Sequence, residues 1–215
     1  MHMKQLILIT GLAFSVSVFA AMPQGVEELQ HEWARIKYKM PQEERAAAFE
    51  ALAHKAEEVS AKNTGRAEPL VWEAIILSSE AGERGGLGAL SLVKKARGLL
   101  EQAEKIQPDA LHGSIYTSLG SLYYQVPGWP VGFGDDDKAR SYLQKALSVN
   151  PKGIDPNYFY GDFLMEQKDY QGAVKAFEKA LAAPPRPTRQ VADAGRRSEI
   201  QAALARAREK LRHDS

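Results

Sequence analysis

The chain has 215 residues, of which 44% are hydrophobic and 26% are charged, and its formal net charge is +1. This balance excludes a wholly disordered chain and lacks the basic excess of a nucleic-acid-binding protein, so we expect one folded unit and no nucleic acid among its partners. The chain has no cysteine. That absence excludes disulfides, thiolate metal sites and a cysteine nucleophile.

The first twenty residues have the order of a secretory signal peptide. Lys4 precedes the apolar run Leu6–Phe19, and Val18 and Ala20 form a small-x-small cleavage pattern. The run is shorter than the roughly 20 residues that cross a bilayer, which favours cleavage after Ala20 over an uncleaved anchor. We therefore expect residues 1–20 to be removed, leaving no membrane span. With no cysteine to lipidate, the mature protein should be soluble and exported, in bacteria to the periplasm.

Beyond this segment, the hydrophobic pattern is helical throughout, without sustained strand-like alternation. In Tyr170–Ala182, apolar residues recur at helical spacing and charged residues take the other face. Prolines then end the helix. Similar patterns predict helices on both sides of Pro41 within Val26–Lys62, and a terminal helix over Thr188–Arg212. The fold class is therefore predicted to be all-α.

Three segments share one pattern when they are aligned on their final prolines: Lys94–Pro108, Asp137–Pro151 and Gln171–Pro185. A small residue, a large apolar residue and a second small residue recur at matching positions. They are Ala96, Ala139 and Ala173, then Leu100, Leu143 and Phe177, then Ala103, Ala146 and Ala180. Another apolar helix precedes each segment. The chain is therefore predicted to repeat a two-helix unit.

This pattern resembles the tetratricopeptide repeat (TPR). Gly161, Ala173, Phe177, Ala180 and Pro185 stand at that repeat's expected offsets, whereas Asn157 replaces its tryptophan. Small residues such as Gly161 and Gly120 would let the first helix approach the second, and Phe177 or Leu143 would fill the space between pairs. The resemblance implies a solenoid of helical hairpins. An irregular helical bundle is the alternative.

The predicted organisation has four parts. A signal peptide covers residues 1–20, and a helical segment that resembles a degenerate repeat covers residues 21–67. About three recognisable repeats cover residues 68–187, and a capping helix covers residues 188–215. A solenoid needs such a cap, because its last apolar face would otherwise be exposed.

Residues 125–137 form the longest break inside a repeat, rich in Gly and Pro and carrying Trp129 and Phe133. These aromatic side chains either pack on the solenoid and hold the loop, or face a partner. The acidic run that starts at Asp135 favours a helix N-cap over a calcium loop, because basic residues follow it. Asp155, followed by Pro156, is interpreted as a second cap. Residues Ala81–Gly88 are expected to form a Gly-rich connector.

The sequence contains few motifs for catalysis, metal binding or nucleotide binding. The five histidines lack zinc-ligand spacing, and the chain contains no nucleophile elbow, Walker loop or dinucleotide fingerprint. We therefore expect no enzyme activity, no cofactor and no metal site.

The predicted function is that of an exported protein-interaction module or scaffold in the cell envelope, which binds a peptide or partner protein in its concave groove. The predicted partner-binding residues are Thr117, Ser121, Tyr124, Trp129, Phe133, Tyr158, Asp162 and Met165, with Glu73 and Leu77 on the same face. The alternative is a transport accessory similar to the T component of tripartite periplasmic transporters. It would bind a solute-binding protein or a small hydrophobic ligand. Known members of that family are lipoproteins, and this chain has no cysteine to lipidate.

Overall fold

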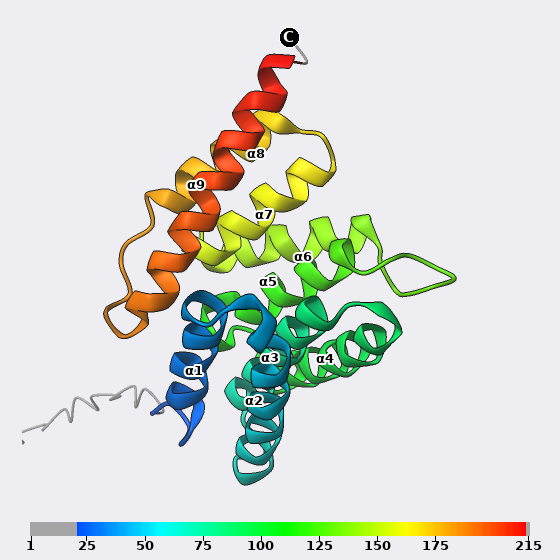
Figure 1. Ribbon diagram of the computed structural model, residues 1–215, viewed down its shortest axis with the longest axis vertical. Helices are drawn as coiled ribbons and strands as arrows, with labels where there is room; N and C mark the ends of the chain where they lie inside the picture. Colours follow the sequence, from blue (N-terminus) through cyan, green and yellow to red (C-terminus); the bar gives the residue numbers. More distant parts are fainter. Residues whose placement is uncertain (1–20, 214–215) are drawn as a thin grey trace, which may run out of the picture.

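The computed structural model describes residues 21–213, so the predicted signal peptide lies outside the described residues. The elements follow one another as antiparallel helices joined by short turns (Figure 1). They are α1 (Val26–Lys39), α2 (Gln42–Lys62), α3 (Ala67–Arg84), α4 (Gly86–Ile106), α5 (Ala110–Gln125), α6 (Asp136–Val149), α7 (Ile154–Glu166), α8 (Tyr170–Leu181), the 3₁₀ helix η1 (Pro187–Arg189) and α9 (Gln190–His213). The protein is an all-α solenoid of helical hairpins, as predicted.

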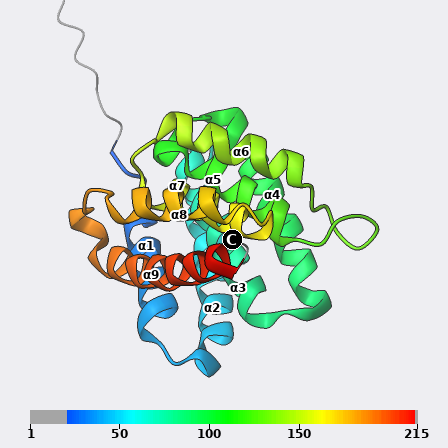
Figure 2. The ribbon, with the colours of Figure 1, turned by 90° about the horizontal axis from the view of Figure 1, so that it is seen from above.

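The helices form an inner and an outer row. Each odd-numbered helix packs on the next, from α1 through α3, α5 and α7 to α9, and the even-numbered helices lie behind them. Helix α9 packs mainly on α8 and also returns to contact α1, a proximity visible in both ribbon views (Figures 1 and 2). The inner row therefore closes on itself and surrounds a central space.

Close helix contacts lie where the repeat pattern predicts them. A Cβ atom added to Gly161 would lie 2.7 Å from Cε1 of Phe177, and one added to Gly120 would lie 2.6 Å from Cγ of Leu143. Phe177 and Leu143 are fully buried. Both glycines therefore lie at close approaches between paired helices, where the predicted repeat register places them.

Asn157, which departs from the repeat pattern, has a structural role of its own. It is 2% exposed. Its amide nitrogen donates hydrogen bonds to the backbone oxygens of Pro151 and Gly153, at 3.0 and 2.8 Å. The side chain therefore donates two hydrogen bonds to the turn before α7, which an indole in this place could not duplicate, since it has a single N–H group.

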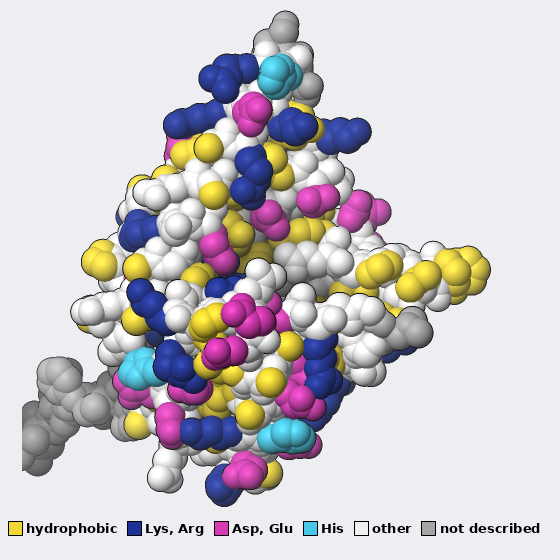
Figure 3. All heavy atoms as spheres, in the orientation of Figure 1, with side chains coloured by type: hydrophobic (Ala, Val, Ile, Leu, Met, Phe, Trp, Pro, Cys, Tyr) yellow, Lys and Arg dark blue, Asp and Glu magenta, His cyan; other side chains and the backbone are white. Residues whose placement is uncertain are grey.

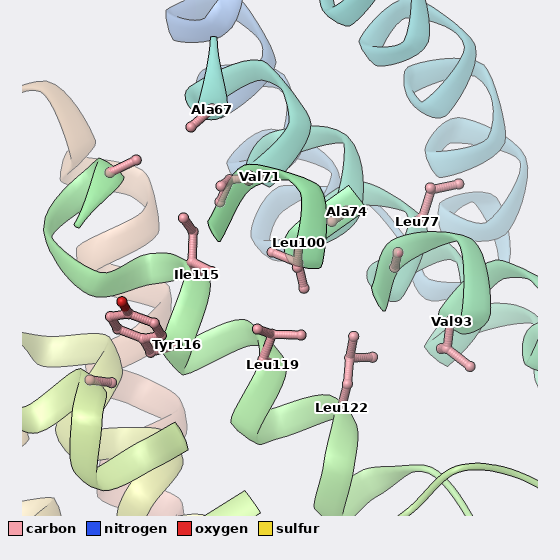
Figure 4. Close-up of a cluster of buried hydrophobic side chains, with 14 of the residues drawn as sticks. Ala67, Val71, Ala74, Leu77, Val93, Leu100, Ile115, Tyr116, Leu119 and Leu122 are labelled. Carbon is pink, nitrogen blue, oxygen red and sulfur yellow. The ribbon is translucent and has the colours of Figure 1, made fainter. Parts of the chain in front are cut away.

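Within the described residues, the buried apolar side chains form three clusters along the solenoid. The first lies among α1–α3 around Phe49, and the second lies among α3–α5 around Leu100 and Leu119 (Figure 4). The third includes Phe177 on α8 and Ile200 on α9. Helix α9 therefore covers the last apolar face, as predicted for the terminal helix.

Some local predictions are corrected. Asp135 does cap α6, since its carboxylate accepts the backbone N–H of Lys138 at 3.0 Å. Asp155, in contrast, is not a cap: it lies one residue inside α7 and forms ion pairs with arginines. The Gly-rich connector predicted over Ala81–Gly88 is helical except at Gly85. This residue separates α3 from α4 and has a φ angle of 62°.

Candidate functional site

A cleft of about 710 Å³ occupies the centre of the closed inner row. Its walls come from α1, α3, α5, α7 and α9, together with the turns that precede α7 and α9. The outer helices contribute no residue from within their own helical bounds to this lining, as far as the described chain shows. The cleft is therefore the concave face of the solenoid, narrowed by the return of α9.

Aromatic side chains form much of the wall. The ring of Trp33 meets those of Tyr38 and Trp72 edge to face, with centroids 5.7 and 6.0 Å apart. On the opposite helix α7, Tyr158 and Phe159 also line the cleft. Such rings offer large contact areas with few side-chain rotations to immobilise, which suits them to binding.

The contact between α9 and α1 depends on a glycine. A Cβ atom on Gly195 would lie 2.2 Å from Cδ1 of Tyr38, so no other residue fits there without movement. The Tyr38 hydroxyl donates a hydrogen bond to Glu199 on α9 at 3.1 Å. The ring of His31 on α1 also lies 3.0 Å from the carbonyl oxygen of Thr188 in η1. These contacts hold the ring closed.

An ion-pair network secures the same end of the cleft. Arg196 on α9 pairs with Asp155 at 3.0 Å and with Glu199 at 2.7 Å. Arg186 pairs with Asp155 at 2.8 Å and with Asp193 at 2.6 Å. Burial opposes ionisation of Asp155, but the charges of Arg196 and Arg186 outweigh it and hold its pKa at about 2. The network therefore ties α7 to α9.

This network should make the stability depend on pH. Because the folded-state pKa of Asp155 lies below that of an unperturbed aspartate, its contribution is present above about pH 4 and is lost as the pH falls to about 2. The difference in unfolding free energy between the parent and Asp155→Asn should shrink by about 2 kcal/mol over that range. Denaturant unfolding at several pH values measures it. A difference that does not change with pH would contradict the role of this charge.

The backbone at the start of α5 is strained. Leu111, His112 and Gly113 all have positive φ angles, of 52°, 54° and 82°. For residues other than glycine, this conformation costs about 1–2 kcal/mol each. Leu111 and His112 line the cleft. Backbone strain of this kind tends to cluster at functional sites, which is a second reason to place the site here.

The predicted partner-binding residues fall into different places. Thr117, Ser121 and Tyr158 line the cleft. Tyr124 is instead engaged with Asp162, to which its hydroxyl donates a hydrogen bond at 2.7 Å between α5 and α7. Met165 packs, partly buried, against the third core cluster.

Two residues expected on the groove face lie elsewhere. Glu73 is buried and pairs with Lys95 at 3.1 Å, and Leu77 belongs to the second core cluster. The α3 residues that line the cleft are instead Trp72, Ile75, Ser78, Ser79, Gly82 and Glu83. The placement of Glu73 and Leu77 on the groove face was therefore wrong, whereas partner binding by the residues of α5 and α7 stays a prediction.

In the long loop between α5 and α6, one aromatic side chain packs on the solenoid and the other is exposed to solvent. Phe133 holds the loop base, with its ring 5.7 Å from that of Tyr123 and the guanidinium of Arg97 above it at 4.3 Å. Trp129 is 90% exposed and Val131 is 61% exposed. They belong to the projecting loop whose hydrophobic tip stands clear of the body in Figure 3. Neither Trp129 nor Phe133 lines the cleft.

Within residues 21–213, no helix is long and apolar enough to span a membrane. The same residues contain no cluster of His, Asp and Glu side chains that could hold a metal ion. Polar groups in the cleft wall are instead hydrogen-bonding side chains such as Ser118, Gln125 and Arg189. This chemistry is suited to binding.

Comparisons with known proteins give one family match and similarities to solved structures. The family model described as tetratricopeptide repeat matches residues 132–207. Among solved structures, MamA of strain AMB-1 is similar at 19% identity and a TM-score of 0.45, covering 85% of this chain and 98% of its own. A thermophilic TPR protein in Thermus thermophilus shows 17% identity and a TM-score of 0.43, covering 86% of this chain and all of its own.

A search of curated proteins found no significant match. None of the matches above is to a component of a tripartite transporter, so the alternative prediction gains no support. The matched range covers α6–α8 and most of α9, and it includes Gly161 and Phe177 but not Gly120. Residues 132–207 are therefore similar to tetratricopeptide repeats, and they form part of an all-α solenoid that α9 closes.

Proposed function

We propose that this protein is an exported interaction module of the cell envelope, which binds an extended segment of a partner protein in the cleft. The observation that carries the proposal is the cleft itself, about 710 Å³ in volume and walled by aromatic side chains. This volume falls within the roughly 300–1,000 Å³ of ligand pockets. Concave, partly apolar surfaces of stacked helices are suited to extended or helical peptides.

The proposed contacts are of two kinds. Tyr158, with Thr117 and Ser121 across from it, offers an aromatic face and hydroxyl groups to the bound segment. Trp129, exposed at the loop tip, is proposed as a second anchor on the partner outside the cleft. The Tyr124–Asp162 pair is proposed to act indirectly by holding α5 against α7, because its polar atoms already satisfy each other.

Site-specific photocrosslinking in cells tests this proposal. A photoreactive residue replaces Ser118 or Tyr158, which line the cleft, and a matched control replaces Ser148, which is exposed on the outer helix α6. We expect one partner to be captured from Ser118 and Tyr158 and not from Ser148. Capture from Ser148 alone, or equal capture from all three positions, would show that the cleft is not the binding surface.

The same captured material tests export. The order of Lys4, the apolar run and the Val18-x-Ala20 site supports cleavage after Ala20. N-terminal sequencing of the crosslinked protein should therefore begin at Ala21. A sequence that begins at Met1 would contradict export through a cleaved signal peptide.

A further inference from the structure

Two hydrogen-bond donors in the cleft wall lack acceptors where η1 meets α3. Neither Nε of Arg189 nor Nε1 of Trp72 has a hydrogen-bond partner among the described residues, although both atoms are buried. Trp72 is 4% exposed, and both residues line the cleft. The neighbouring Trp33 differs, because its Nε1 donates to Oγ of Ser79 at 2.8 Å. Buried donors without acceptors are costly, so this pair is suited to an acceptor from outside the chain.

Where η1 meets α3, the positive charge of Arg189 has no ion-pair partner among the described residues. Among the cations that line the cleft, Lys37 pairs with Glu83, and Arg186 and Arg196 pair with Asp155. Lys152 and Arg189 have no ion pair among the described residues. Within residues 21–213, no carboxylate lies within ion-pair distance of Arg189, and its neighbour in the cleft wall is another arginine, Arg186. Burial and the charge of Arg186 lower the pKa of Arg189, and they outweigh the opposing charges of Asp155 and Asp193.

The two donors are also placed to act together. The guanidinium carbon of Arg189 lies 4.9 Å from the centroid of the Trp72 ring. A guanidinium that stacks on an aromatic ring keeps its planar edge of N–H groups available, and that edge matches the two oxygens of a carboxylate. Trp72 therefore orients the guanidinium of Arg189, and the indole N–H of Trp72 adds a further hydrogen-bond donor where η1 meets α3.

We infer that Arg189 and Trp72 form a subsite for a carboxylate carried by the bound segment, either an acidic side chain or a free C-terminus. The inference rests on the proposed function and specifies the chemistry of its ligand. The planar guanidinium edge of Arg189 presents parallel N–H groups to two coplanar oxygens, which is the arrangement found in a carboxylate. The apolar surfaces of Trp33 and Ile75 line the same cleft and provide space for side chains next to the carboxylate.

Degenerate peptide pools test this subsite on the purified chain. One pool allows Asp and Glu at its variable positions, and the matched pool allows Asn and Gln instead. Each pool is made with a free and with an amidated C-terminus, so that the two sources of a carboxylate are separated. Retained peptides are identified by mass spectrometry, and inorganic phosphate is added in parallel as a competing free anion.

We expect the parent to enrich carboxylate-bearing peptides by about tenfold over their neutral counterparts, the factor that corresponds to one charge-assisted contact. Arg189→Gln should abolish this preference, whereas Arg206→Gln, an exposed arginine on α9, should retain it. Trp72→Phe keeps an aromatic ring but removes the N–H group, and it should lower the enrichment without abolishing it. Thermal unfolding of each variant confirms that it is folded.

Each other outcome would overturn the inference. Equal enrichment of the neutral, amidated pool and of every carboxylate-bearing pool would contradict the carboxylate subsite while leaving the proposed function intact. Full retention of the preference in Arg189→Gln would place the carboxylate elsewhere. Displacement of all peptides by millimolar phosphate would show a site for a free anion only. Failure of the parent to retain any peptide would contradict the proposed function together with the subsite.

Discussion

Phe177→Ala is expected to lower the free energy of unfolding by about 3–5 kcal/mol, the cost of removing a fully buried phenylalanine. The ring is 0% exposed and fills the space against Gly161, in the cluster that joins α7, α8 and α9. The surrounding helices are rigid and cannot collapse fully into the cavity. Denaturant unfolding followed by circular dichroism measures the loss.

Phe177→Leu is the matched control, because it retains most of the apolar contact and should cost clearly less than the alanine variant. Equal and small effects of both changes, below about 1 kcal/mol, would show that the ring does not fill the space between hairpins. The repeat register drawn through Gly161 and Phe177 would then be wrong.

Gly195→Leu should destabilise the protein by about 1–3 kcal/mol and separate α9 from α1. The reason is steric: even the first side-chain atom would lie 2.2 Å from the Tyr38 ring, and a leucine extends further. Gly98→Leu is the control, since nothing lies within 4 Å of a Cβ atom at that position on α4. Thermal unfolding of the two variants gives the comparison.

The separation of α9 from α1 has its own measurement. In Gly195→Leu, the backbone amides of α1 should exchange hydrogen with solvent faster than in the parent, whereas Gly98→Leu should leave them unchanged. If both variants unfold at the same temperature and exchange alike, Gly195 does not mark a close contact. The closed inner row would then be contradicted.

Local patterns were sufficient to predict the helices of the solenoid. Hydrophobic spacing and small residues such as Gly120 and Gly161 act between neighbouring helices of one hairpin, so they appear as a short-range repeat. The same reasoning failed for the face of α3. Glu73 was assigned to the groove as a position that points away from the second helix of its hairpin, but it is buried in an ion pair with Lys95 on α4.

The cleft was harder to predict, because it depends on contacts between distant parts of the chain. Thr117, Ser121 and Tyr158 line the cleft because they share the inner face of hairpins whose register the sequence indicates. The residues contributed by α1 and α9 were missed, since no periodicity indicates that the last helix returns to the first. Asp155 has the sequence context of a helix N-cap. Its ion pair with Arg196 forms only in the folded chain, because the two residues lie on different helices.

Hydrogen exchange of the protein with and without its captured partner segment tests most directly whether the cleft is the binding surface. Binding in the cleft predicts slower amide exchange at residues 111–118 of α5 and at residues 187–196, which bracket the space. Exchange in the outer helices α4 and α6 should not change. Protection confined to those outer helices, with residues 111–118 and 187–196 unaffected, would contradict the proposal that the partner lies in the cleft.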